Sequence, residues 1–193
     1  MTELFVTLAL IMLIVGILLP ALNKAKETGK LATCLNNLRQ IGQAIYLYMD
    51  DHEFKFPGVY DTVATNRWYQ KLEPYIDDNE IYRCSKYDAH VYADGSHFSY
   101  GFNYRGLNTP KVGVPAFIGK DLISVKSPGQ CIMVTEATGG SMVGGSSFFV
   151  EKNAIIARHK GGAPILFVDG HVAWYRLSQI PMSGAQSQIW WGY

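Results

Sequence analysis

Charged side chains are nearly absent from the first 23 positions of this 193-residue chain. Glu3 is the only one there among the chain's 17 Lys and Arg and 16 Asp and Glu residues. A net charge is nearly absent too, since the formal charge is +1, and this argues against a protein that binds nucleic acid through a basic surface. With 48% hydrophobic and 17% charged residues the chain is not disordered, and a mean hydropathy of +0.03 excludes a multispanning membrane protein. The sequence therefore describes two unlike parts.

The first part is an uncharged apolar segment at positions 4–23. As a helix with a rise of about 1.5 Å per residue it would span about 30 Å, the thickness of the hydrocarbon core of a bilayer. A cleavable signal peptide is the alternative, but basic residues before the apolar run and a small-x-small site after it are lacking. We therefore predict a retained membrane-spanning helix at 1–23.

The helical pattern continues beyond this segment but becomes amphipathic. Gly16 and Pro20 should bend or locally melt the helix near the end of the apolar run. Apolar side chains then recur every three or four positions, which predicts one buried face up to about Met49. These side chains are Leu31, Cys34, Leu35, Leu38, Ile41, Ile45 and Tyr48. We expect an amphipathic continuation at 24–50 and a globular head at 51–193.

Glu3 is unusual because an ionised carboxylate is costly in hydrocarbon. It could lie at the level of the lipid headgroups. It could instead pair with the free amino group of Met1 on a neighbouring subunit, and such a pair would fix the axial offset between packed helices. The sequence leaves both readings open.

The head contains all but three of the aromatic residues, which is ample material for one core. The pattern predicts a short helix over 68–76 stopped by Pro74, and strands at 99–104, 131–136 and 147–150 with a Gly- and Ser-rich loop at 139–147. Asp169-Gly170 lies between two β-rich runs and predicts a hairpin over 163–175 with a two-residue type I′ turn. The expected fold class is α+β, with a long N-terminal helix packed on a small antiparallel sheet.

Two groups of residues resemble one protein family. Glu3, the run ending at 16–22, the lysines at 24 and 26, and the segment 34–42 resemble the mature end of type IV pilins and type II secretion pseudopilins. His159 stands ten positions before Asp169-Gly170, similar to the prepilin-type H-x9-D-G (DUF1559-like) domain. Segments 81–85 and 99–103 extend the resemblance. Two residues precede the glutamate here, whereas the family usually has four, and no leader is seen, so we expect a processed form.

The resemblance implies a fold and a function. It implies a type IV pilin-like fold and a non-enzymatic structural subunit that polymerises with copies of itself through the apolar helix, with Met1, Glu3, Gly16 and Pro20 as assembly residues. It implies an inner-membrane assembly machinery as partner, storage in that membrane, and then an extracellular pilus or periplasmic pseudopilus. We expect no cofactor and no nucleic acid. The alternative is a monomeric membrane-anchored binding module, favoured by Trp174, Trp190, Trp191 and Tyr193.

Histidines and carboxylates offer a further alternative. His159, Asp169 and His171 could form a two-histidine, one-carboxylate metal site. The more economical reading is that His159 hydrogen-bonds the hairpin and that Asp169 supplies a left-handed turn conformation. The acidic segment 77–80 offers oxygen ligands but lacks the glycine and spacing of a calcium loop.

The three cysteines lie far apart in the sequence, at 34, 84 and 131. They allow one disulfide and a spare thiol, and no Cys-x2-Cys pair is present to indicate zinc. A bond between Cys34, on the apolar helix face, and Cys84 would tie the head to the helix. Closing a loop of about 50 residues would contribute on the order of 4 kcal/mol.

Overall fold

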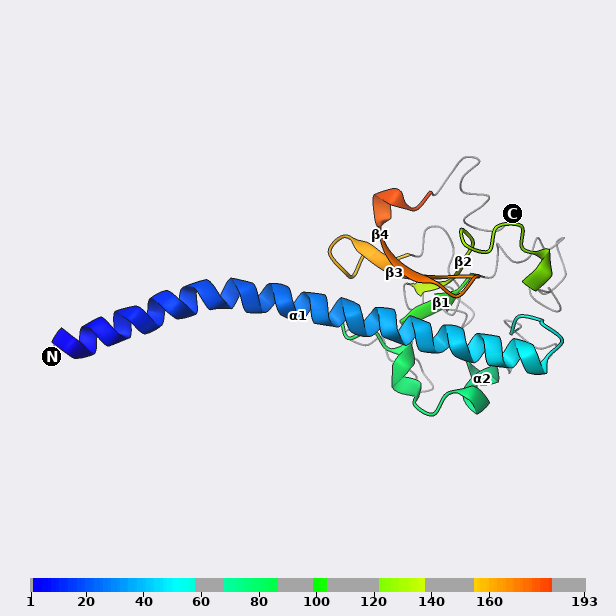
Figure 1. The fold of residues 1–193 in the computed structure, drawn as a ribbon, viewed down its shortest axis with the longest axis horizontal. Coiled ribbons are helices and arrows are strands. Elements are labelled where there is room, and N and C mark those ends of the chain that lie inside the picture. Colours follow the sequence, from blue (N-terminus) through cyan, green and yellow to red (C-terminus); the bar gives the residue numbers. More distant parts are fainter. Residues whose placement is uncertain (1, 58–67, 87–98, 104–121, 138–154, 182–193) are drawn as a thin grey trace, which may run out of the picture.

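The computed structural model describes residues 2–57, 68–86, 99–103, 122–137 and 155–181. One long helix carries a small head at its C-terminal half (Figure 1). The expected strand at 147–150, the loop at 139–147 and the aromatic residues Trp190, Trp191 and Tyr193 lie outside the described residues, as does Met1.

Helix α1 (Thr2–Asp51) is a single helix of 50 residues, about 75 Å long. Pro20 lies inside it, and the helix stays continuous there while its axis curves gently (Figure 1). It runs slightly beyond the expected end at Met49. The exit is a tight turn, because Glu53 and Phe54 have positive φ values of 53° and 57° and the Phe54 N–H donates to the Met49 carbonyl oxygen at 2.8 Å.

The head contains a four-stranded antiparallel sheet in the order β1-β2-β3-β4. The strands are β1 (Tyr100–Phe102), β2 (Ile132–Glu136), β3 (Gly162–Phe167) and β4 (Val172–Arg176). In the register Gly101 faces Thr135, and Ile165 faces Ala173. A long N-terminal helix with a small antiparallel sheet confirms the α+β class and three of the expected strand regions.

The β3–β4 hairpin is confirmed, but the expected turn is wrong. The Gly170 N–H donates to the Phe167 carbonyl and the Phe167 N–H donates to the His171 carbonyl, both at 3.0 Å, which makes a three-residue loop. Gly170 alone has a positive φ there, 89°, so Asp169 does not take the left-handed conformation. The two-residue turn lies before β3 instead, where Lys160 and Gly161 both have the positive φ that type I′ requires.

Short helices complete the described head. The expected helix over 68–76 is split into α2 (Trp68–Lys71) and a 3₁₀ turn η1 (Glu73–Tyr75). Pro74 lies in the first turn of η1, where its missing N–H costs nothing, so it begins this turn and does not stop a helix. The other 3₁₀ turns are η2 (Asn79–Tyr82), η3 (Leu122–Ser124) and η4 (Leu177–Gln179).

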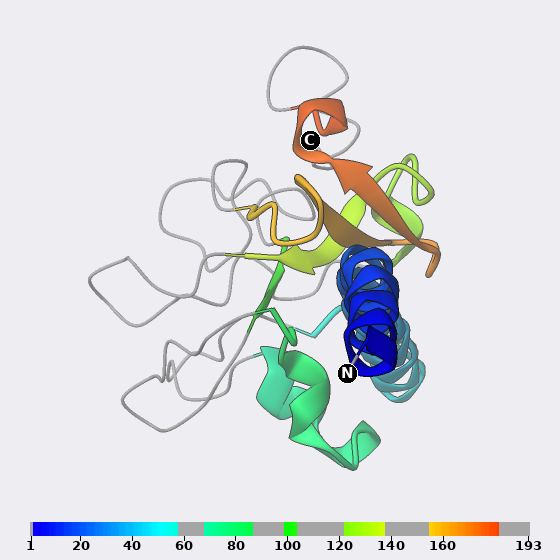
Figure 2. The same cartoon turned by 90° about the vertical axis from the view of Figure 1, so that its left-hand side faces the viewer.

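The C-terminal half of α1 is built into the core of the head. Its buried apolar face packs against one face of the sheet and against the α2–η2 segment, which lie on different sides of the helix (Figures 1 and 2). The buried residues on this helix include Cys34, Leu38, Ile41, Ile45 and Met49, at the spacing the sequence predicted. The other face of the sheet is covered by a second cluster that includes Ile132, Ile165 and Ile180. The head therefore holds one half of α1 firmly.

Candidate functional sites: an exposed helix and a buried cysteine–histidine–glutamate cluster

The N-terminal half of α1 makes no core with the other described residues. Every side chain from Thr2 to Lys26 is exposed, and the large apolar ones are between 44% and 70% exposed. This helix includes a stretch long and apolar enough to cross a membrane, none of which is buried inside the protein. Such a surface is stable only when lipid or another protein covers it.

The sequence-predicted assembly residues lie along this exposed half. Glu3 is exposed, and among the described residues none forms an ion pair with it. Gly16 is open, since a Cβ added there would meet nothing within 4 Å. Pro20 lies four positions further along the helix. All three are therefore available to a neighbouring molecule.

The two ends of the H-x9-D-G motif bracket β3 and meet α1 at two points. At the Asp169-Gly170 end, the Tyr46 hydroxyl of α1 donates a hydrogen bond to the Val168 carbonyl. A Cβ on Gly170 would lie 3.0 Å from the Tyr46 ring, so a glycine is needed for the close approach as well as for its φ of 89°. Asp169 caps the turn by accepting from the His171 N–H at 3.1 Å.

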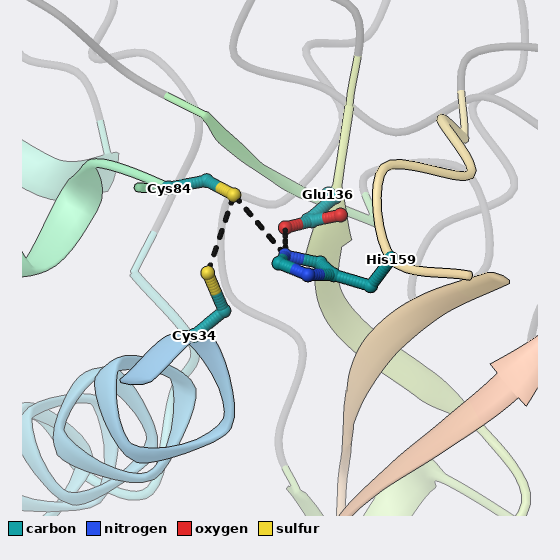
Figure 3. Close-up of side chains that lie close together, drawn as sticks. All are labelled: Cys34, Cys84, Glu136 and His159. Atoms are coloured by element: carbon teal, nitrogen blue, oxygen red, sulfur yellow. Dashed lines mark hydrogen bonds and ion pairs between the residues drawn. The ribbon is translucent and has the colours of Figure 1, made fainter. Parts of the chain in front are cut away.

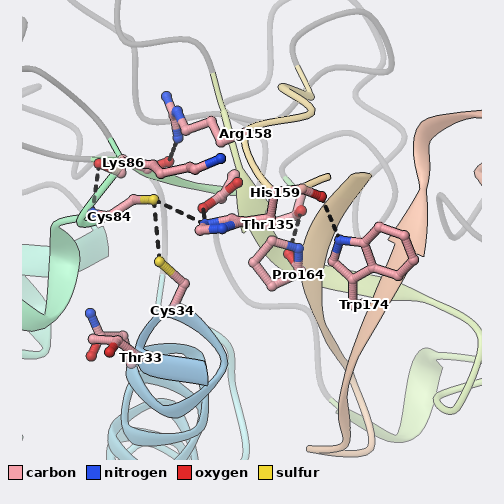
Figure 4. A network of polar contacts seen from close by, with 12 residues as sticks. Thr33, Cys34, Cys84, Lys86, Thr135, Arg158, His159, Pro164 and Trp174 are labelled. Atoms are coloured by element: carbon pink, nitrogen blue, oxygen red, sulfur yellow. Dashed lines mark hydrogen bonds and ion pairs between the residues drawn. The ribbon is translucent and has the colours of Figure 1, made fainter. Parts of the chain in front are cut away.

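At the other end, His159 does hold the hairpin, but through its backbone. Its N–H and carbonyl exchange hydrogen bonds with Gly162 at 3.1 and 3.0 Å, and its carbonyl accepts from the Trp174 indole N–H at 2.9 Å. Its side chain points the other way, into the interior (Figure 4). The ten positions between His159 and Asp169 therefore cover the turn before β3, β3 itself and the start of the loop after it.

The His159 side chain joins a buried cluster with Cys34, Cys84 and Glu136 (Figure 3). The Cys34 and Cys84 sulfurs are 3.2 Å apart, and the Cys84 sulfur is 3.3 Å from His159 Nε2. The same nitrogen lies 3.0 Å from Glu136 Oε1. One ligand atom from each residue lies within 4.8 Å of every other, and all four residues are at most 1% exposed.

Each member of the cluster comes from a different element. Cys34 lies on the buried face of α1, and Glu136 ends β2. Cys84 follows η2, and its N–H donates to the Ser99 hydroxyl at 2.9 Å. His159 is fixed by the turn before β3. The four segments are thereby brought to one point between the helix and the sheet.

Two basic side chains lie beside the cluster in Figure 4, Lys86 and Arg158. Lys86 forms an ion pair with Glu27 of α1. The Arg158 guanidinium donates to the carbonyls of Ser99 at 3.0 Å and Ala137 at 2.8 Å. These contacts hold the segments around Cys84 and Glu136 together.

The contacts within the cluster shift the pKa values of its side chains in opposite directions. A hydrogen bond from the Cys84 thiol, helped by His159, lowers the pKa of Cys34 to about 4 against the opposing effect of burial. The same pairing with Cys34, together with burial, raises the pKa of Cys84 well above its usual range. Burial opposes the charge on His159, but the nearby Cys34 sulfur and the Glu136 carboxylate outweigh this and raise its pKa to about 9. These shifts favour negative charge on Cys34 and positive charge on His159.

The three-residue metal site suggested by the sequence does not form. His159 lies in the cluster, whereas Asp169 and His171 pair with one another at 2.6 Å, and the His171 ring stacks on Phe167. In the acidic segment 77–80, Asp78 accepts from the Glu80 N–H at 2.9 Å and caps η2, which is the structural role expected of a solvated turn.

The sequence analysis identified Cys34, Cys84 and His159 as candidate residues, but it did not predict that the three lie together. It paired Cys34 with Cys84, and the structure places these two as thiols in contact; the disulfide between them stays a prediction. It missed Glu136, whose only sequence signal was a carboxylate at the end of an apolar strand. Comparison of the chain with protein-family models, with curated proteins and with solved structures finds no match.

Proposed function

We propose that this protein is a structural subunit of a filament of the type IV pilus or pseudopilus kind, held in the membrane by the N-terminal half of α1 before assembly. The observation that carries the proposal is the exposed apolar half of α1, which continues without a break into a half that is buried in the head. Because the helix is continuous, the position of its apolar half fixes the position of the head.

The physical argument concerns what covers the apolar half. Before assembly, lipid would cover it, and the stretch is long and apolar enough to cross a bilayer. In a filament, the same surface would pack on the corresponding helices of other copies, so that assembly exchanges lipid contacts for helix contacts without exposure to water. Gly16 would permit a close approach of two helices, because nothing lies near its Cα.

The charge pattern is consistent with this arrangement. Glu3 lies at the end of the exposed half with no cation beside it among the described residues, so a partner such as the amino terminus of a neighbouring copy would remove the cost of placing it in an apolar filament core. The formal charge of +1 for the whole chain would let copies pack densely without strong repulsion.

The resemblance to prepilin-type proteins supports the same function and extends it. It would add an inner-membrane assembly machinery as partner, and an extracellular or periplasmic location for the assembled filament. The H-x9-D-G segment contacts α1 twice, since Tyr46 donates to the Val168 carbonyl and the Lys160 ammonium donates to the Thr28 hydroxyl. These contacts support a structural role for the motif in docking the hairpin on the helix.

A Glu3→Ala variant tests the proposal, with Thr7→Ala as a control, because Thr7 is also exposed and donates only to the Leu4 carbonyl one turn away. We expect Glu3→Ala to remain in the membrane fraction and to lose at least 90% of the filaments that can be sheared from cells, and Thr7→Ala to keep both. Normal filaments in Glu3→Ala cells would exclude the assembly role of this carboxylate.

The second candidate, a monomeric membrane-anchored binding module, is favoured by one feature of the head. A cavity of about 650 Å³ lies where α1 enters its final turns, lined mainly by apolar side chains that include Tyr46, Leu47 and Phe54. Its size suits a small ligand. Trp174 is not among the residues that line it. A monomeric module would keep its ligand in the Glu3→Ala variant and would form no filaments in either protein.

A further inference from the structure

The separations within the buried cluster are close to those of a tetrahedral zinc site. With zinc–sulfur bonds of about 2.3 Å and zinc–nitrogen or zinc–oxygen bonds of about 2.0–2.2 Å, neighbouring ligand atoms lie about 3.3–3.8 Å apart. In the cluster three separations are 3.2, 3.3 and 3.0 Å, and all the ligand atoms lie within 4.8 Å of one another. To hold the ion, the closest pairs would move apart by about half an ångström and the more distant pairs would draw together.

The chemistry of the donors points the same way. Two cysteine sulfurs, one imidazole nitrogen and one carboxylate oxygen are all ligands that zinc takes in proteins, and thiolate with imidazole selects it over magnesium or calcium. Four protein ligands complete the tetrahedral shell and leave no position for a substrate. Such a site is structural and not catalytic.

Without a metal, the cluster leaves buried polar atoms without partners. Among the described residues, neither Glu136 Oε2 nor His159 Nδ1 has a hydrogen-bond partner, although both side chains are at most 1% exposed. A buried carboxylate oxygen without a donor costs free energy. A divalent cation at the centre of the cluster would offset two of the three negative charges that this carboxylate and the two thiolates carry.

We propose that Cys34, Cys84, Glu136 and His159 bind one Zn²⁺ and that this ion joins α1 to the head. Zinc binds cysteine as thiolate and histidine as neutral imidazole, so every proton held by the two sulfurs and by His159 Nε2 leaves to solvent when the ion enters. Each ligand comes from a different segment, so the ion would link the helix to three parts of the head that are far apart in the sequence. Its binding free energy would add to the stability of that junction.

A disulfide between Cys34 and Cys84 is the alternative use of the same sulfurs, and the two uses exclude each other. The bond would use both sulfurs but would leave Glu136 and His159 as a buried pair with an unpartnered carboxylate oxygen. Zinc would bind one atom of each of the four side chains and would place positive charge beside this carboxylate, which a disulfide does not do. The geometry therefore favours the metal.

The test uses the full chain purified in detergent micelles from cells supplied with zinc, with no chelator or added oxidant. Elemental analysis should find about one zinc per chain. X-ray absorption at the zinc edge should show two sulfur ligands at about 2.3 Å and two lighter ligands at about 2.0–2.2 Å. This reading needs no variant and so does not depend on whether a variant folds.

Variants then assign the site. Cys84→Ser and His159→Gln should each lower zinc affinity at least tenfold. Cys131→Ser is the matched control, because Cys131 is equally buried but stands outside the cluster, and it should keep the metal. Cobalt added to the metal-free wild-type chain should give the thiolate charge-transfer band of a tetrahedral site, and Cys84→Ser should lose it.

Three results would overturn the proposal. The first is a Cys34–Cys84 disulfide and no metal in the protein as isolated, found by mass spectrometry of the unreduced chain. The second is two free thiols with no uptake of zinc or cobalt. The third is zinc retained at full affinity by both Cys84→Ser and His159→Gln, because the ion would then be bound elsewhere.

Discussion

The two halves of α1 belong to one unbroken helix and meet two different surroundings. From Thr2 to Lys26 every side chain is exposed, whereas from Cys34 to Met49 the helix carries eight buried residues that form part of the core of the head. The first half is apolar on all sides, and the second is apolar on one face only. A helix that is apolar all round needs an apolar medium on all sides, and an amphipathic one needs a single packed face.

This difference shows which apolar surface of α1 is covered within the protein and which needs a partner. The buried face of the second half is covered by the sheet and by the short helices, so the apolar residues on that face are already packed. The first half is covered by none of the residues that the structure describes. The comparison predicts that substitutions in the second half change folding, and that substitutions in the first half change membrane insertion and assembly.

The largest effect is expected from a matched pair of isoleucines. Ile41 is fully buried, and Ile41→Ala should lower the free energy of unfolding by about 2–5 kcal/mol. Ile11 is 61% exposed, and Ile11→Ala should change it by less than about 0.5 kcal/mol. Denaturant unfolding in micelles, followed by the fluorescence of buried Trp68, measures both. Equal losses would remove the distinction between the halves.

Two lysine substitutions at equally exposed positions compare membrane insertion in the two halves, and here the larger effect is expected in the first half. Ile14 and Leu47 are both 54% exposed. Ile14→Lys should disfavour insertion by about 2.5–3.5 kcal/mol, the cost of a lysine at the centre of a spanning helix, and Leu47→Lys should leave insertion unchanged. Carbonate extraction of membranes measures the inserted fraction. Full retention of Ile14→Lys would show that this half does not cross the bilayer.

A smaller effect is expected where the hairpin meets the helix. Tyr46→Phe removes the hydroxyl that donates to the Val168 carbonyl and should cost about 0.5–1.5 kcal/mol. Tyr48→Phe on the same helix, which leaves Tyr46 and its bond to Val168 in place, is the control. The same unfolding measurement applies. An unchanged Tyr46→Phe would mean that the Asp169-Gly170 turn does not depend on α1.

The smallest effect separates two glycines of α1. Gly29 has open space around it, so Gly29→Ala should stabilise the helix by up to about 1 kcal/mol. At Gly42 a new Cβ would lie 3.0 Å from a methyl carbon of buried Leu166, and this contact should cancel or reverse the gain. Thermal melting by circular dichroism compares them, and a gain of the same size at both would contradict the close packing at Gly42.

Much of the fold could be predicted because its signals are local. Uniform apolarity at 4–23 and the spacing of Leu38, Ile41 and Ile45 indicated one helix with two environments. β-rich runs located three strand regions. The turn at Asp169-Gly170 was misjudged because the dipeptide fits both a two-residue and a three-residue loop. The hydrogen bonds of Phe167 decide between them, and the sequence does not contain these.

The buried cluster could not be predicted because its signal is not local. Cys34 and Cys84 are 50 positions apart, and Glu136 and His159 are 23 apart. Zinc sites are recognised in a sequence by closely spaced pairs of ligands, which are lacking here. The four side chains meet because α1 packs against η2 and β3, and because β2 pairs with β3 beside the turn that carries His159.

The central claim is that the exposed half of α1 is covered by the same half of other copies. Electron cryomicroscopy of filaments sheared from cells, with the subunit identified from its density, tests it most directly. We expect helices 2–23 of neighbouring copies to pack along the filament axis, with the heads outside. Native filaments that lack this chain, or a filament in which the heads form the axis and these helices stay apart, would contradict the account.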